Sequence, residues 1–276
     1  MSITTSQQIA RYYEQFNAID VTFTKEVIKA TLLYPKQVYL KCLGYQWSCI
    51  VYSTSMIGAR VLVNLHSTLN ETVRKANNLV SLRFSFLQRD KADPLTFFVA
   101  SKITGFTPYG PKKPDFSFVS LQYTQRPPDG LIEILGELLE ANVNSQKRSE
   151  DRIAVTADSM RKIGLTSKEA TVLIQGVPRR CILRDLSFSG AKVVIFGIAQ
   201  FIVNRDAVLR LELEEPANIL EIEGKIVRFE PVEGRSDIAA FAIQFTETAV
   251  PMDYKLRVNT YLKTFRVKPA EETSHE

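Results

Sequence analysis

The stretch RRCILRDLSFSGAKVV occupies residues 179–194 and decides how the second half of the chain folds. A strand-like run ends at Asp185, three small or acidic residues follow in quick succession up to Gly190, and a second strand-like run begins there. Such residues between two β-rich runs are typical of a hairpin turn. The sequence therefore predicts an antiparallel strand pair, and it leaves open whether the turn also holds a ligand.

Further β-rich runs surround this hairpin. Leu209, Leu211 and Leu213 alternate with charged residues, and a second alternation runs through Phe241 and Ile243. Alternation of this kind indicates strands with one packed face and one wet face, as in an antiparallel barrel. The expected strands of this half occupy residues 152–157, 169–175, 179–187, 190–197, 207–214, 218–230 and 238–245, and a closing helix is expected over 251–267.

The first half of the chain also contains short β-rich runs separated by turn-like segments, preceded by helical patterns. Helices are predicted over 3–17 and 23–33, with Thr24 as N-cap of the second. Six short strands then suggest a small barrel or sandwich. They are expected at residues 37–43, 46–54, 59–65, 79–87, 95–106 and 116–125, with turn-like pieces at 67–78 and 107–115. Most of the aromatic rings of Tyr45, Trp47 and Tyr52 are expected to pack in the core or in an interface, and the alternative is a binding surface on this domain.

A helical pattern follows the breaker RPPDG, with apolar residues recurring from Leu131 to Leu139. The polar segment at 142–151 is interpreted as a linker. The fold class is therefore all-β, with two small antiparallel barrels and flanking helices. We expect domains at residues 1–144 and 145–265, and a mobile tail at 266–276.

Composition narrows the function classes. The apolar fraction of 45% and charged fraction of 24% are ordinary for a globular protein, no run suggests a membrane span, and the N-terminus has no secretory pattern. A cytoplasmic protein is expected. The three cysteines lack CxxC spacing, and His66 and His275 are the only histidines, so a disulfide framework and metal centre are not expected. An enzyme is the least supported class, because no nucleophile or metal constellation can be assembled.

Two motifs stand out. Arg148 and Arg152 have the spacing RxxxR in the linker, and Asp185, Ser187 and Gly190 fit DxSxxG. Each is weak alone, since DxSxxG occurs by chance in about one chain in ten of this length. A second RxxxR pair, Arg180 and Arg184, lies on one face of the strand before the turn and is interpreted as exposed and incidental.

Taken in order, with RxxxR before the first strand of a β domain and DxSxxG at a later turn, the motifs resemble the PilZ family of cyclic di-GMP receptors. The likeness covers about residues 145–265, and the first half resembles the β-rich domain that precedes PilZ in flagellar-brake-type and spirochaete proteins. The resemblance implies a PilZ-type barrel, cyclic di-GMP as ligand rather than a cofactor, and no catalysis. The implied ligand-binding residues are Lys147, Arg148, Arg152, Asp185, Ser187 and Gly190.

Chemistry suits this assignment. The arginine fork matches the O6/N7 edge of guanine or a phosphate, and a fixed carboxylate such as Asp185 accepts the N–H donors of the guanine edge. The Ser187 hydroxyl is expected to bind phosphate or position Asp185, while Gly190 allows a positive φ or a close backbone approach where the turn meets the ligand. The resemblance also implies that the residue before the RxxxR pair, often another arginine in the family, is tied to the number of ligand molecules bound. Lysine at 147 therefore leaves the ligand stoichiometry open.

These expectations lead to one predicted function and one alternative. The ligand would order the linker against the barrel and change the arrangement of the domains, with the flagellar motor or another motility or envelope target as partner. The alternative is a basic barrel that binds nucleic acid, which the net charge of +5 allows. No basic-aromatic interleaving like an RNA-recognition signature is found in the sequence.

Overall fold

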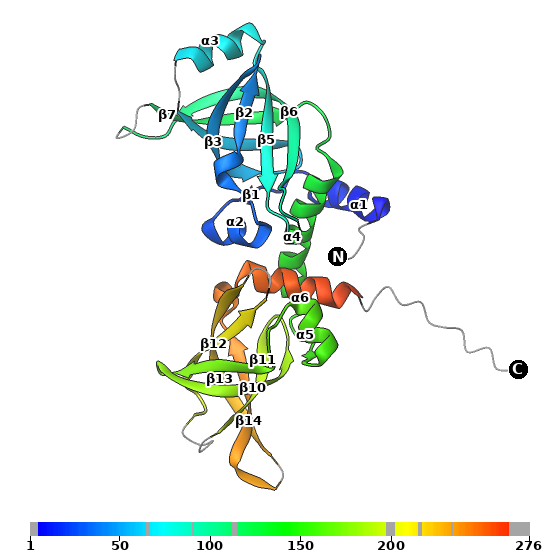
Figure 1. Ribbon diagram of the computed structural model, residues 1–276, viewed down its shortest axis with the longest axis vertical. Coiled ribbons are helices and arrows are strands. Elements are labelled where there is room, and N and C mark those ends of the chain that lie inside the picture. The colour runs from blue at the N-terminus through cyan, green and yellow to red at the C-terminus, as the bar shows by residue number, and fades with distance from the viewer. Residues whose placement is uncertain are drawn as a thin grey trace, which may run out of the picture. The chain divides into compact units, whose positions relative to one another are not determined.

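A computed structural model gives the fold of most of the chain (Figure 1). It describes residues 5–64, 67–89, 91–111, 115–196, 202–214, 217–232 and 234–264. The chain forms two compact units that meet in sequence between Leu139 and Glu140. Both histidines and the expected tail at 266–276 lie outside the described residues.

The first unit is a closed barrel of six antiparallel strands, in the order β3-β2-β5-β6-β7-β4 with β4 pairing back to β3. A short strand β1 adds to β3. The strands are β1 (Val21–Thr22), β2 (Tyr39–Cys42), β3 (Tyr45–Thr54), β4 (Gly58–Asn64), β5 (Leu79–Phe86), β6 (Leu95–Pro108) and β7 (Phe116–Tyr123). The helices are α1 (Ser6–Phe16), α2 (Lys25–Thr31), α3 (Ser67–Lys75) and the first part of α4 (Asp129–Lys147), with a 3-10 turn at Pro35–Gln37.

Local sequence accounts for the helix starts in this unit. The Thr24 hydroxyl accepts a hydrogen bond from the Val27 amide at 3.2 Å, which confirms it as the N-cap of α2.

The expected turn at 67–78 is wrong, because α3 occupies most of it. Leu69 and Val73 are buried at helical spacing, and this burial holds the helix on the barrel.

Packing in the core, one of the two environments expected for the β3 aromatic side chains, is wrong for Tyr45 and Tyr52. Tyr45 is 62% exposed and Tyr52 is 46% exposed, whereas Cys49 and Val51 are buried. Alternation along β3 places Tyr52 on the outer face and Cys49 and Val51 in the core. Tyr45 has the same parity as Cys49 and is exposed because it is the first residue of β3, paired with Cys42 beside the hairpin turn.

The second unit is another closed barrel of six antiparallel strands, in the order β10-β11-β14-β13-β12-β9 with β9 pairing back to β10. A short strand β8 adds to β10. The strands are β8 (Ile153–Ala154), β9 (Glu169–Ile174), β10 (Val177–Leu186), β11 (Gly190–Phe196), β12 (Asp206–Leu213), β13 (Asn218–Val232) and β14 (Arg235–Phe245). The helices are the end of α4, α5 (Ala157–Ile163) and the closing helix α6 (Met252–Thr264), with a 3-10 turn at Glu247–Ala249.

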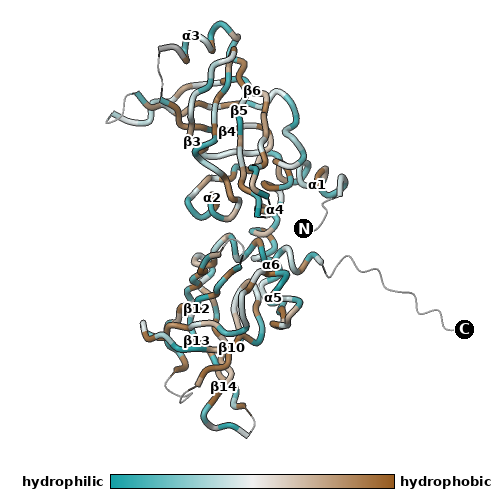
Figure 2. The backbone as a smooth tube through the Cα atoms, viewed as in Figure 1, coloured by the Kyte–Doolittle hydropathy of each residue, from teal (hydrophilic) through white to brown (hydrophobic). Residues whose placement is uncertain are grey.

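The expected alternation holds in this barrel, because Leu209, Leu211 and Leu213 all point into its core. The all-β prediction with two antiparallel barrels and a closing helix is thereby confirmed. Apolar and polar segments alternate along the strands of both barrels in Figure 2.

Two expectations around the linker are wrong. The strand expected at 152–157 is only the two residues of β8, and α5 follows because Thr156 and Ser159 form a capping box. The linker expected at 142–151 is helical up to Lys147. The end of α4 is held to α6, since the Asn144 amide donates to Asn259 Oδ1 at 2.8 Å and Lys263 pairs with Glu140.

The cysteines are buried free thiols. Burial raises the pKa of Cys49 and of Cys181 to about 12, so neither is a ready thiolate. The helices in the described ranges are too short or too polar to span a bilayer. No group of three potential metal ligands occurs within the part of the chain that the structure describes.

Candidate ligand site on the second barrel

Strand pairing brings the two sequence motifs together. β8 pairs with β10 so that Ala154 lies opposite Asp185 and Ile153 opposite Leu186. Arg152 immediately precedes β8, and its Nη1 donates to Asp185 Oδ1 at 2.5 Å. The linker arginine and the carboxylate of the turn motif, 33 residues apart in sequence, are thus neighbours on the barrel surface.

Arg148 immediately follows α4 and has a different partner. Its Nε and Nη2 both donate to Asp151 Oδ2, at 2.7 and 2.6 Å. Arg148 and Arg152 line one pocket of about 510 Å³, together with Ala154, Tyr261 and Leu262 among others. The structure therefore brings the two linker arginines to one cavity beside α6.

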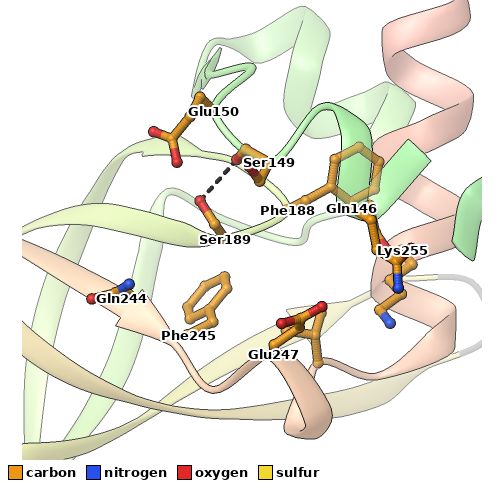
Figure 3. Close-up of a pocket in the computed structure, with 11 residues that line it drawn as sticks. Gln146, Ser149, Glu150, Phe188, Ser189, Gln244, Phe245, Glu247 and Lys255 are labelled. Carbon is orange, nitrogen blue, oxygen red and sulfur yellow. Dashed lines mark hydrogen bonds between the residues drawn. The ribbon is translucent and has the colours of Figure 1, made fainter. Parts of the chain in front are cut away.

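A second pocket, of about 420 Å³, lies beside the same linker (Figure 3). Ser149 and Glu150 border it from the linker, and Phe188 and Ser189 border it from the turn. The Ser189 hydroxyl donates to the Ser149 carbonyl at 2.8 Å, the dashed line in Figure 3. Sequence reasoning missed these residues, although Phe188 and Ser189 are the two variable positions between the serine and the glycine of the DxSxxG motif itself.

Ser187 has a structural position. Its side chain is fully buried, its Oγ donates to the Gly190 carbonyl at 3.2 Å, and its amide donates to the same carbonyl at 2.8 Å. Tyr254 of α6 donates its hydroxyl hydrogen to the Ser187 carbonyl at 2.7 Å. In this structure Ser187 thus closes the turn, and its hydroxyl has no surface to offer a ligand.

Gly190 makes its close backbone contact with a neighbouring strand. It is not among the positive-φ glycines of the described chain. A Cβ at this position would lie 2.3 Å from the Ile243 carbonyl oxygen on β14, so the close approach is between two strands. Lys147 is exposed at the end of α4, and Arg180 and Arg184 are exposed on β10, as expected for the incidental pair.

The fold has the features that the resemblance to PilZ implies: a closed six-stranded barrel, a closing helix and an arginine-bearing linker beside the turn. The family model of the PilZN3 domain matches residues 7–142, and that of the PilZ domain matches residues 146–261. A protein of Treponema denticola named "Cyclic di-GMP binding protein" is 45% identical over 272 residues, which cover 99% of this chain and 86% of the relative. The chain therefore belongs to the PilZ family.

Solved structures with lower identity also match. The Borreliella burgdorferi PlzA protein in complex with c-di-GMP is 22% identical, with a TM-score of 0.42 over 93% of this chain and 98% of that one. The Bacillus subtilis inhibitor of motility MotI/DgrA is 13% identical, with a TM-score of 0.32 over 84% of this chain and 96% of that one. Family membership does not favour the alternative of a nucleic-acid-binding barrel.

Proposed function

We propose that this protein is a non-catalytic effector that binds cyclic di-GMP at the linker of the second barrel. The observation that carries the proposal is the placement of Arg148 and Arg152 on one pocket, with Asp185 fixed beside Arg152. The 45% identity to a relative named as a cyclic di-GMP binding protein supports the same ligand.

Each residue has a distinct role in this proposal. Arg148 and Arg152 contact guanine edges or phosphates with their forks, and Asp185 orients Arg152 and accepts guanine N–H donors. A guanidinium has five N–H donors, so the bond from Nη1 to Asp185 leaves Arg152 with donors for a ligand. Ser187 and Gly190 hold the turn, and Lys147 adds positive charge next to Arg148.

The binding test is titration calorimetry of the full chain with cyclic di-GMP, with cyclic di-AMP as the matched control. Guanine offers two acceptors on its O6/N7 edge where adenine offers an acceptor and a donor, so the arginine forks should distinguish the two ligands. We expect saturable binding of cyclic di-GMP, with adenine dinucleotide at least about tenfold weaker because bidentate contacts are lost. Equal affinity for both would contradict guanine recognition.

We further propose that ligand binding changes the arrangement of the domains and that the output is motility or another bacterial process in the cytoplasm, through a protein partner such as the flagellar motor. The arginines follow directly on α4, the helix that runs through the boundary between the two units. A ligand that moves the linker acts on this helix. Small-angle scattering with and without saturating cyclic di-GMP tests this step, and identical profiles would contradict it.

Asp151 is expected to compete with the ligand for Arg148, because it accepts both the Nε and the Nη2 hydrogen bonds. Asp151→Asn keeps the size and removes the charge. A partly exposed ion pair contributes up to about 1 kcal/mol, so the affinity for cyclic di-GMP should rise about two- to fivefold. Calorimetry measures the change.

The matched control is Asp237→Asn, which removes a carboxylate that likewise accepts two bonds from one arginine, Arg235 on β14. It should leave the affinity unchanged. Weaker binding by Asp151→Asn would show instead that Asp151 holds Arg148 in its binding position.

A further inference from the structure

Strand register extends the neighbourhood of Asp185 across the outer face of the barrel. Asp185 on β10 lies opposite Lys192 on β11, Lys192 lies opposite Ala242 on β14, and Ala242 lies opposite Arg228 on β13. Side chains that are directly opposite in a sheet point to the same face. One row of side chains, Asp185–Lys192–Ala242–Arg228, therefore runs from the arginine linker to β13, and we refer to it as the cation row.

Lys192 reaches over its neighbouring strand. Its Nζ lies 2.5 Å from Glu230 Oε2, and Glu230 is on β13, with β14 between the two. The outward residues of β14 at this level are Ala240 and Ala242, which face Glu230 and Arg228 in the register. Ala242 points outward, away from Phe241 and Ile243 in the core, and is 7% exposed. The two alanines form a flat floor that bulkier residues would fill.

Several positive charges converge on Glu230. Its hydrogen bond to Lys192 lowers its pKa below the ordinary value, and the charges of Arg228 and Arg152 lower the pKa further. The charges of Arg152 in the linker and of Arg228 on β13 thus both act on this carboxylate. Arg228 is exposed and forms no ion pair with any residue in the described ranges.

We propose that the cation row is part of the cyclic-dinucleotide site, with Lys192 and Arg228 binding the phosphodiester oxygens and Ala240 and Ala242 forming the floor beneath the ligand. Glu230 is then an internal competitor that holds Lys192. This inference rests on the function proposed above. A lysine ammonium and an arginine fork both bind phosphate, and the small side chains let a flat purine approach the sheet closely.

The row differs from an ordinary surface ion pair in what its removal does. The side chains of Lys192 and Glu230 are 30% and 51% exposed. If their ion pair were purely structural, it would contribute little to stability, and its loss would have no effect on ligand binding. A ligand-binding lysine with a competing carboxylate gives opposite effects for the two partners. Loss of the lysine weakens binding, and loss of the carboxylate strengthens it.

The test is calorimetry of the full chain with cyclic di-GMP on charge-specific variants. Lys192→Met keeps the aliphatic stem and removes the charge, and Arg228→Gln does the same for the arginine. Each should weaken binding about three- to tenfold. A charge-assisted hydrogen bond to the ligand is lost, and hydrogen bonds from water to the phosphate offset part of the lost binding free energy. Lys192→Arg should bind within about twofold of the parent chain. Glu230→Gln should strengthen binding about two- to fivefold, an effect that partial unfolding cannot produce.

The matched control is Arg210→Gln with Glu221→Gln, which removes the exposed pair between β12 and β13 at 2.7 Å. Neither should change the affinity. If the parent chain binds cyclic di-GMP while Lys192→Met, Arg228→Gln and Glu230→Gln bind as tightly as the parent, the cation row is overturned and the linker site stands. If the parent chain does not bind cyclic di-GMP, the proposed function and the cation row are both overturned.

Discussion

Arg152→Ala is expected to weaken the binding of cyclic di-GMP roughly ten- to a hundredfold, because charge-assisted hydrogen bonds to a ligand are each worth about 1.5–3 kcal/mol. The side chain is 39% exposed, lines the pocket of about 510 Å³ that Arg148 also lines, and forms an ion pair with Asp185. Its loss removes a fork from the ligand and also leaves Asp185 without its partner. Both effects act in the same direction, which makes this the largest expected change in affinity.

Arg152→Lys separates charge from geometry. Lysine retains the positive charge but presents a single ammonium, which cannot make the paired bonds that a guanine edge or a phosphate accepts from a planar fork. We expect the lysine variant to recover little of the lost affinity. Binding close to that of the parent chain would show that position 152 supplies only charge.

Arg180→Ala is the matched control for Arg152→Ala. It also removes an exposed arginine from an RxxxR pair. Arg180 lies on β10 before Cys181, at the end of the strand away from the turn. The affinity should stay unchanged, and thermal unfolding should confirm that both variants are folded. Titration calorimetry that finds Arg152→Ala and Arg180→Ala equal in affinity would contradict the assignment of the linker arginines.

The sequence predicts the barrels well because their strands alternate clearly, and Leu209, Leu211 and Leu213 are buried as their spacing indicates. It predicts the ends of elements poorly where side chains far apart in sequence decide. Helix α4 continues to Lys147 through a segment that is polar enough to be a linker, since Asn144 is bonded to Asn259 of α6. No local pattern near residue 144 contains that partner.

The same limit applies to the site. The motif residues are visible as RxxxR and DxSxxG, but the pairing of Arg152 with Asp185 depends on the register of β8 against β10. The cation row is harder still to predict from the sequence. A register shift in β13 between Ile226 and Arg228 leaves Val227 as the extra residue, so Arg228 lies opposite Ala242. Simple alternation from the buried Ile226 would have turned Arg228 inward.

Gly190→Ala is expected to destabilise the second barrel by about 1–3 kcal/mol, the usual cost of forcing extra volume into a packed site. The added Cβ would lie 2.3 Å from the Ile243 carbonyl oxygen, so β11 and β14 must separate at the turn. Thermal unfolding of the full chain should show a fall of several degrees in the Tm of this barrel. Gly105→Ala is the control, because a Cβ there meets nothing within 4 Å.

The same variant decides what the glycine of the DxSxxG motif does. Gly190 accepts two hydrogen bonds from Ser187 with its carbonyl and approaches a neighbouring strand with its Cα, so both of its contacts belong to the fold. At a temperature where Gly190→Ala remains folded, its affinity for cyclic di-GMP should therefore fall less than that of Arg152→Ala. An unchanged Tm with lost binding would reverse this assignment and place the ligand against the Gly190 backbone. A lowered Tm with nearly normal binding would mean that the motif combines one ligand-binding carboxylate, at Asp185, with a serine and a glycine that hold it in place.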